Sequence, residues 1–394
     1  MQKTASVKDG QSHFASMCRR TKAVDLTFVP RYYTTCNAGV VELVDTGDLK
    51  SPEPQGSYGF NSRPRQFLFH LEKIMYTPIF IIVAKLLIQW TTGYLLFQPR
   101  IMRRYVLPPA MFLIMKVMFP LHFVWNLPRG WERAVSAGWY WLLIFFTAAF
   151  LMILMQLWIS KFFVKPGSLL DTEHPRSMRV LFAMHNAGFI PLPIMAVLAP
   201  LEVNIYMFMY VLGFNIVFWT AAVHMLSNRG GGFRIKINPP LIGIFVGIVI
   251  AVFDLSDFIP RVIVPVLRIS GTYTLDLMMI LLGGVLATIP RSDLKYRPEF
   301  GKLVGLRFFL YPALMMIVAA LLPLGWLPQE IQWGLRLALV VQAAVPPATN
   351  VMLIAKLYGR DDQVHYIGTG IITTYLSSLI TLPIFLVLAT IFFR

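Results

Sequence analysis

Long apolar segments separated by short polar stretches fill the chain from Met75 to its last residue. A helix that crosses the hydrocarbon core of a bilayer needs about 20 predominantly apolar residues. Ten segments have this character, and they predict an all-α membrane protein with ten transmembrane helices. The expected helices cover residues 77–97, 105–126, 138–164, 177–199, 204–226, 239–258, 262–289, 303–325, 332–357 and 366–392.

The amino-acid composition agrees with this pattern. Hydrophobic residues make up 57% of the 394 residues and charged residues only 14%, whereas a soluble domain carries about 25% charged residues. The formal net charge of +16 would fit a nucleic-acid partner, but surplus Lys and Arg in a membrane protein mark cytoplasmic loops. We therefore expect the protein to reside in a lipid bilayer and to bind no nucleic acid.

Residues 1–74 differ from the rest of the chain. They contain both cysteines and no apolar run as long as a signal-peptide core. The stretch 39–65, GVVELVDTGDLKSPEPQGSYGFNSRPR, is similar to the conceptual translation of a transfer RNA gene. We expect this non-membrane tail to be a mis-assigned upstream translation, with Met75 as the natural start; a regulatory tail is the alternative. A transfer RNA gene directly upstream suits a prokaryote.

The charges of the loops predict the orientation of the chain. The loops after the first, third, fifth, seventh and ninth expected helices hold sixteen Lys and Arg, and the opposite side of the membrane holds five. Short cytoplasmic loops carry the excess of positive charge, so both termini should face outward. We expect the cell membrane (inner or plasma) to be the location.

The ten expected helices divide into two sets of five. They occupy residues 75–226 and 239–394, joined by a short cytoplasmic linker at 227–238. An odd number of helices in each half places the two halves in opposite orientations across the membrane. This is the inverted-repeat organisation of many secondary transporters.

The fourth helix of each half contains helix-breaking residues in its middle. The first run is MHNAGFIPLP, from Met184 to Pro193, and the second is QAAVPPATN, from Gln342 to Asn350. Proline in a helix removes a backbone hydrogen bond and clashes with the preceding turn. Broken helices at matching positions of two repeats mark a substrate site. A half-helix that starts after Pro347 would present its positive end to an anion.

The segment from Val341 to Tyr358, VQAAVPPATNVMLIAKLY, resembles the ninth-helix signature of the auxin efflux carrier family of plant and prokaryotic transporters. The run HNAGFIPLPIM is similar to the Asn-then-Pro segment in the fourth helix of that family. NPPLIG at 238–243, followed by Gly247, resembles the opening of its sixth helix, and Gly283-Gly284 resembles a glycine pair in its seventh. The resemblance covers essentially all of 75–394.

This resemblance implies two inverted repeats of five helices whose broken fourth and ninth helices cross at their breaks, as in sodium/proton-antiporter-like folds. One group of helices would form a scaffold, often the interface of a homodimer, and the other a moving transport domain. Family substrates are organic anions: auxin in plants, and malate or malonate in bacteria. The chain resembles a prokaryotic malate or malonate permease, since only Ser227–Asn238 stand where plant carriers have a long hydrophilic loop. The predicted substrate-binding residues are Asn186, Pro193, Pro346, Pro347 and Asn350 by position in the family, and Thr349 as a further polar group beside the break.

Ionisable residues deep in the expected spans are costly and are candidates for function. Asp276 is a candidate for proton or sodium coupling, and a structural ion pair with Lys85 or Lys116 is the alternative. Two deep lysines against one aspartate leave excess positive charge, which suits an anionic substrate. His185, next to Asn186 at the first break, would either carry a proton or pack as a hydrogen-bonded side chain.

Two arginines fall inside expected spans but close to their ends. Arg307 and Arg336 are four residues into the segments 303–325 and 332–357. Long cationic side chains near helix ends reach toward water along the apolar surface. We therefore expect a structural role for both.

These observations favour a secondary transporter that moves small organic anions, such as malate, malonate or auxin-like acids, by alternating access. The alternative on the same scaffold is an exchanger of protons or sodium. A membrane enzyme or sensor is disfavoured, because the sequence pairs no nucleophile with a base and appends no soluble domain. No cofactor or metal is expected: the run Gly230–Gly232 lacks the Lys-Ser/Thr of a phosphate-binding loop, and no His/Asp/Glu cluster has metal-ligand spacing.

Overall fold

The computed structural model describes residues 63–227, 238–288 and 297–394, and their side chains from Ile79 onward. The first 62 residues of the expected tail and most of the expected linker therefore lie outside the described residues. Helix α3 begins at Arg63, so the expected boundary at Met75 falls inside a helix.

Every secondary-structure element in the described residues is a helix. The one extended pairing among these residues is an isolated antiparallel bridge. Helices that follow a break or a loop often begin with proline, which is compatible with the first helical position because the N–H there has no partner. The elements are α3 (Arg63–Leu96), η1 (Met102–Val106), α4 (Leu107–Phe112), η2 (Leu113–Met118), α5 (Phe119–Gly138), α6 (Tyr140–Phe163), α7 (Pro175–Ala183), α8 (Pro191–Leu198), α9 (Leu201–Leu226), α10 (Pro239–Val252), η3 (Leu255–Phe258), α11 (Val264–Ala287), α12 (Pro298–Gly305), η5 (Leu306–Leu310), α13 (Tyr311–Leu321), α14 (Gln329–Ala344), α15 (Asn350–Tyr358) and α16 (Asp361–Phe393).

Within the described ranges, seven helices are long enough and apolar enough to cross a membrane. They are Ile79–Leu96, Met102–Gly138, Tyr140–Phe163, Leu201–Leu226, Val264–Ala287, Pro298–Leu321 and Asp361–Phe393. Three other expected segments are helical but do not meet this criterion: α10 has 14 residues, and the segments 177–199 and 332–357 are each interrupted. These helices make the protein an all-α, multi-pass membrane protein.

Two of the long helices contain π-helical turns, in which the backbone is wider than in an α-helix: η1 and η2 lie in Met102–Gly138, and η5 lies in Pro298–Leu321. A proline stands two residues beyond the end of each turn, at Pro108, Pro120 and Pro312. The proline ring collides with the carbonyl group four residues earlier, which here lies inside the π turn. The wider turn accommodates that carbonyl group, so the helix continues through the proline without a break.

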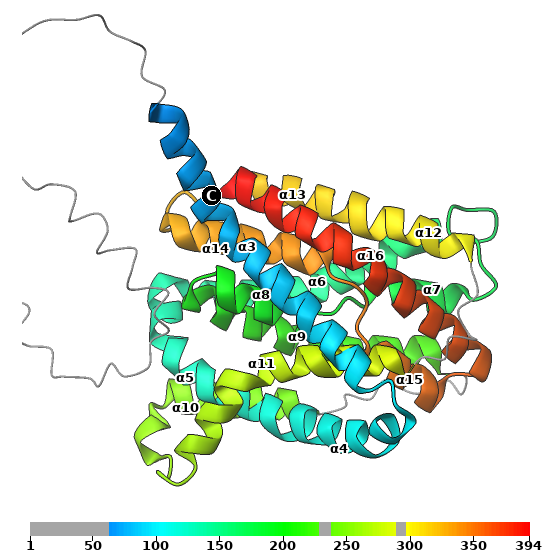
Figure 1. Ribbon diagram of the computed structural model, residues 1–394, viewed down its shortest axis with the longest axis horizontal. Helices are drawn as coiled ribbons and strands as arrows, with labels where there is room; N and C mark the ends of the chain where they lie inside the picture. The colour runs from blue at the N-terminus through cyan, green and yellow to red at the C-terminus, as the bar shows by residue number, and fades with distance from the viewer. Residues whose placement is uncertain (1–62, 228–237, 289–296) are drawn as a thin grey trace, which may run out of the picture. The chain divides into compact units, whose positions relative to one another are not determined.

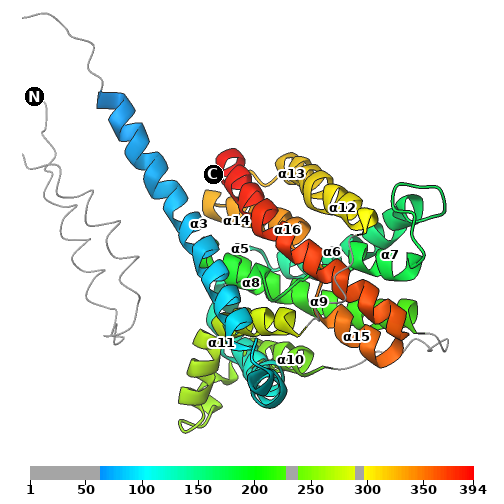
Figure 2. The ribbon, with the colours of Figure 1, turned by 45° about the vertical axis from the view of Figure 1, so that its right-hand side comes forward.

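Two groups of helices are distinguished by their contacts. In the first group, α5 packs along α10 and α11; in the second, α6 packs along α9 and α14 packs along α13 and α16. Figures 1 and 2 show α10 and α11 beside the α4–α5 helix, and α16 beside α13 and α14. Contacts between α5 and α9 join the two groups.

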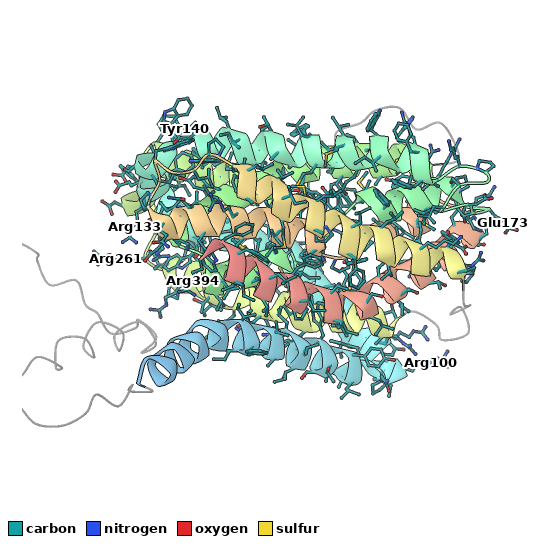
Figure 3. The ribbon with its side chains drawn as sticks, turned by 90° about the horizontal axis from the view of Figure 1, so that it is seen from above. Arg100, Arg133, Tyr140, Glu173, Arg261 and Arg394 are labelled. Carbon is teal, nitrogen blue, oxygen red and sulfur yellow. The ribbon has the colours of Figure 1, made fainter. Side chains whose placement is uncertain are left out.

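The loops alternate between the two ends of the helices. Figure 3 shows Arg100 and Glu173 at one end, and Arg133, Arg261 and Arg394 at the other. Arg100 and Glu173 belong to the loops assigned to the cytoplasmic side from the sequence, whereas the other three belong to the opposite side. These five residues therefore lie at the helix ends where the expected topology groups them, and which end faces the cytoplasm stays a prediction.

Glycines of two sequence motifs lie where helix backbones approach each other closely. A Cβ atom on Gly283 of α11 would lie 2.1 Å from the carbonyl oxygen of Trp90 on α3, and one on Gly243 of α10 would lie 2.4 Å from the Cα atom of Pro120 on α5. Small residues permit this close approach between membrane helices. The glycine motifs thus have a packing role in this structure.

We expect Gly283→Val to lower the free energy of unfolding by about 1–3 kcal/mol, because the added side chain would overlap the Trp90 backbone and force the helices apart. Thermal unfolding of the full chain in detergent measures the effect. Gly301→Val is the control, since nothing lies within 4 Å of a Cβ atom there. An unchanged melting temperature for Gly283→Val would show that α3 and α11 do not pack this closely.

Candidate functional site

The first interruption separates α7 from α8. Helix α7 ends at Ala183, and α8 begins at Pro191. Proline is compatible with the first position of a helix, where the N–H has no partner, so Pro191 marks the start of α8. The intervening residues leave the helical path at Met184, whose φ and ψ are −91° and 77°.

The second interruption separates α14 from α15. Helix α14 ends at Ala344, and Val345 is extended with φ and ψ of −77° and 150°. The cause is local: Val345 precedes Pro346, and a residue before proline favours extended backbone. Helix α15 then begins at Asn350, with Thr349 as its N-cap residue.

The two extended segments pair with each other in antiparallel orientation. His185 lies opposite Pro347, flanked by two hydrogen bonds of 2.8 Å, from Asn186 N–H to the Pro346 carbonyl and from Ala348 N–H to the Met184 carbonyl. The Pro347 position is one that makes no ladder hydrogen bond, so its missing N–H costs nothing. The interrupted helices therefore meet at their breaks, an arrangement that we call the crossing.

Side chains alternate along the first extended segment, so His185 and Asn186 face different neighbours. His185 faces α9 and α6. Its Nε2 atom lies 2.7 Å from the Tyr210 hydroxyl, which donates to the sulfur of Met152. The Phe214 ring packs edge-on against the imidazole, with 5.0 Å between centroids. His185 is thus fully buried in the protein.

Asn186 faces α16 instead. Its Nδ2 atom donates to the Tyr375 hydroxyl at 3.0 Å, and its Oδ1 atom accepts from the Phe189 N–H at 2.9 Å. The Tyr375 hydroxyl also lies close to Thr349. Tyr375 therefore connects the two interruptions from one side, and sequence analysis did not single it out.

The structure brings several of the predicted substrate-binding residues together. Asn186, Pro346, Pro347 and Thr349 are buried at the crossing. Asn350 is half-buried at the start of α15. The sixth predicted residue, Pro193, is buried in the first turn of α8. Contact with a substrate remains a prediction for all six.

The ion-coupling candidates are more widely spread, and only His185 lies at the crossing. Lys85 on α3 forms an ion pair of 2.6 Å with Asp276 on α11, and Gln89 Nε2 donates to the same carboxylate at 3.0 Å. The structural ion pair considered from the sequence is therefore present, with Lys85 as the partner. Lys116 is exposed on η2.

The expectation for Arg307 was wrong. Its side chain is only 1% exposed, and its Nη1 atom donates to the carbonyl group of Ala343, one residue before the end of α14. The reason is that the helix begins at Pro298 and not near 303. Arg307 thus lies about 14 Å along the helix from its start, at 1.5 Å per residue, too deep to reach water.

Two buried glutamines were also missed. Gln342 Nε2 donates to the carbonyl group of Ala187 at 3.1 Å, which adds a link between α14 and the first interruption. Gln156 is fully buried on α6. A lone polar residue in an apolar helix is a usable signal, and Gln156 stands in the run LMILMQLWIS, from Leu151 to Ser160.

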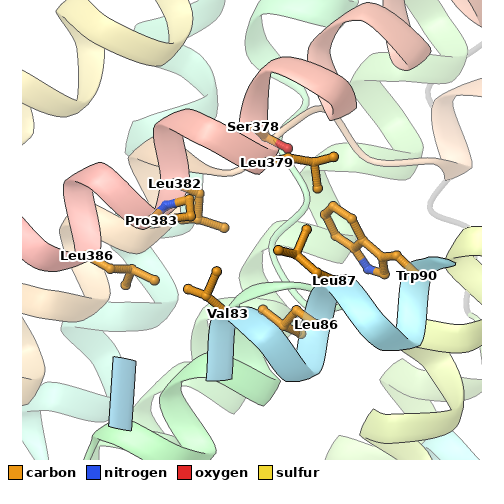
Figure 4. Close-up of a pocket in the computed structure, with 9 residues that line it drawn as sticks. All are labelled: Val83, Leu86, Leu87, Trp90, Ser378, Leu379, Leu382, Pro383 and Leu386. Carbon is orange, nitrogen blue, oxygen red and sulfur yellow. The ribbon is translucent and has the colours of Figure 1, made fainter. Parts of the chain in front are cut away.

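An apolar groove lies beside the crossing. Its walls are side chains of α3 and α16, which point toward one another in Figure 4. Trp90, at one end, packs against the ring of Tyr375 with 5.9 Å between centroids. The lining residues are Val83, Leu86, Leu87, Trp90, Ser378, Leu379, Leu382, Pro383 and Leu386.

Apolar spanning helices, together with two interrupted helices that meet through extended backbone, are the arrangement of a membrane transporter. Residues 232–386 match the family model described as Membrane transport protein, and no curated protein matches the chain. The matched range runs from the linker into α16 and includes the second interruption. It indicates a multi-pass membrane transporter and supports the resemblance to the auxin efflux carrier family.

Proposed function

We propose that the protein is a secondary transporter that moves small organic anions across the cell membrane by alternating access. The observation that carries this proposal is the antiparallel pairing of the two interruptions. Non-helical backbone inside a membrane protein is tolerated where it is buried in protein or lines a watery cavity. The crossing would therefore bind the substrate between two inverted five-helix repeats.

The chemistry near the crossing suits a carboxylate. Helix α15 starts there, and the positive end of a helix dipole attracts anions. Asn186 and Thr349 supply neutral polar groups. Carboxylates such as malate and malonate are the substrates that the family resemblance implies, and auxin-like acids are further members of the class.

Alternating access requires one part of the protein to move against another, and we assign these roles to the two helix groups. The group of α5, α10 and α11 would act as a scaffold, and also as the dimer interface if the chain forms a homodimer. The group that contains the crossing would move against it. The positive loops would face the cytoplasm, with both termini outside, in a prokaryotic cell membrane.

The test is electrical recording from liposomes that contain the full chain, after addition of malate, malonate, acetate or indole-acetate. We expect a current for at least one acid. Asn350→Ala should reduce this current about fivefold, because losing one hydrogen bond to the substrate costs about 1 kcal/mol. Asn215→Ala is the control, because Asn215 is equally half-buried but lies on α9. Absence of current for every acid in a well-folded protein would refute the proposal.

The same liposomes test the alternative, an exchanger of protons or sodium. That function would require Asp276 to release Lys85, to which it is bound at 2.6 Å. Ion currents that follow a pH or sodium step without any organic acid, and that Asp276→Asn abolishes, would establish the exchanger. Currents that depend on the acid and survive Asp276→Asn would support the organic-anion transporter.

A further inference from the structure

Arg307 is a buried cation that has no carboxylate partner among the residues that the structure describes. The ion pairs of the described residues join Lys85 to Asp276, His174 to Asp362, Arg297 to Glu299, and Arg360 to Asp362. Arg307 takes part in none of them, although it is among the most deeply buried side chains. An uncompensated charge in a protein interior is strongly unfavourable, so its presence needs a physical reason.

Capping of α14 uses only some of the N–H donors of the Arg307 guanidinium group. The Nη1 donor satisfies the Ala343 carbonyl near the negative end of α14. The Nε and Nη2 atoms are buried and have no hydrogen-bond partner among the described residues. Since an arginine carries five N–H donors, most of its capacity is unused by the cap.

The unused donors belong to a cluster. Tyr311, whose ring centroid lies 4.9 Å from the Arg307 guanidinium carbon, has a buried hydroxyl beside the amide of Gln156. Neither group makes a well-formed hydrogen bond with the described residues. His185 is within electrostatic range of Arg307, and its Nδ1 atom has no hydrogen-bond partner in the part of the chain that the structure describes. Of the sixteen buried side-chain polar atoms without a hydrogen bond in the described residues, six belong to these four side chains.

The donors and the positive charge of the cluster indicate which kind of ligand it would bind. Arg307, Tyr311 and the Gln156 amide all offer donors, and the net charge of the cluster is positive. An ionised carboxylate is acceptor-only and carries the opposite charge, and arginine binds it with two parallel N–H groups. We propose that Arg307, Tyr311 and Gln156 form a site for the carboxylate of the transported acid, on the α6 side of the crossing.

The position of the site connects it with transport, and this step rests on the proposed function. Helix α6 precedes the first interrupted helix in the chain, and η5 with α13 precedes the second. Arg307 contacts α14 at Ala343, just before the break. A carboxylate bound there would lie next to the break of the second interrupted helix, so a movement of the crossing would change its contacts. Because Arg307 and Gln156 are shielded from solvent, the anion enters only when the packed helices move apart.

The first experiment measures the affinity of the purified full chain for malonate and acetate by calorimetry, with chloride as the inorganic anion. Arg307→Gln should weaken binding by about tenfold or more, because it removes a charged hydrogen-bond donor, and Arg307→Lys should retain part of it. Arg336→Gln is the control: this arginine is also partly buried and bonds a backbone carbonyl, that of Leu322, but lies outside the cluster.

Tyr311→Phe separates a binding role from a structural one. Among the described residues, the Tyr311 hydroxyl makes no well-formed hydrogen bond and has only the Gln156 amide beside it, so its removal should change the melting temperature little. If the hydroxyl binds the carboxylate, the same variant should lower malonate affinity about threefold to tenfold. Full affinity in Tyr311→Phe, together with full affinity in Arg307→Gln, would overturn the site.

The outcomes also distinguish this inference from the proposed function. Malonate transport that retains its half-saturating concentration in Arg307→Gln would overturn the site and leave the transporter intact. Carboxylate binding that depends on Arg307, without transport of any acid in liposomes, would leave the site and refute the transporter. Chloride binding as tight as malonate binding, and equally sensitive to Arg307→Gln, would overturn the assignment to a carboxylate.

Discussion

Replacing Ala348 with proline should reduce organic-acid transport by about a hundredfold. The substitution removes the N–H that bonds the Met184 carbonyl at 2.8 Å, one of the two hydrogen bonds that hold the crossing together. A proline in place of a needed donor costs about 3 kcal/mol, which corresponds to about two factors of ten. The liposome current for the preferred acid measures the loss.

Ala348→Ser is the matched control for this change. Serine is also small and keeps the N–H, so transport should stay within about twofold of the original. Monodisperse elution in detergent would show that both variants fold. Normal transport in a well-folded Ala348→Pro protein would mean that the pairing of the two interruptions has no part in the transport cycle.

The second large effect should come from Asn186→Ala. This change leaves the Phe189 N–H without its partner and removes the amide donor of the Tyr375 hydroxyl, which then has only Thr349 close by. Each unsatisfied buried group costs about 1–3 kcal/mol, so we expect transport to fall by at least about tenfold. Initial rates of radiolabelled acid uptake into liposomes would report it.

A buried asparagine elsewhere provides the comparison. Asn204 is 8% exposed and donates to the Ala199 and Pro200 carbonyls at the start of α9. Asn204→Ala should lower stability and leave the transport rate per folded molecule unchanged. Equal losses of rate in both variants would show that Asn186 supports the fold in general and has no special position at the crossing.

The interruptions could be predicted from the sequence because their causes are local. Val345 precedes Pro346 and is extended, and α14 ends just before it. Pro191 stands at the first position of α8, whereas α7 ends eight residues earlier, at Ala183. The pairing of the two segments came from the family resemblance alone. Composition and spacing carry no information on which segments meet across about 160 residues of chain.

The surroundings of the crossing were harder to predict. Tyr375 lies among apolar and hydroxyl residues of a long helix, and nothing in its neighbourhood along the chain distinguishes it. Arg307 was misplaced because the hydropathy window began the helix too late, whereas Pro298 at the first helical position sets the true start. Tyr375 was missed for a different reason: its role depends on packing between helices, which hydropathy along one helix does not report.

The alternation of His185 and Asn186 has a consequence for how the crossing moves. A shift of one residue in the register of an antiparallel pair turns every side chain to the opposite face. Here such a slip would carry the imidazole away from Tyr210 and the amide away from Tyr375, leaving buried polar groups unpaired on both sides. Sliding of one extended segment past the other would therefore cost these hydrogen bonds, so in the proposed transport cycle we expect the interrupted helices to keep their register and to move together.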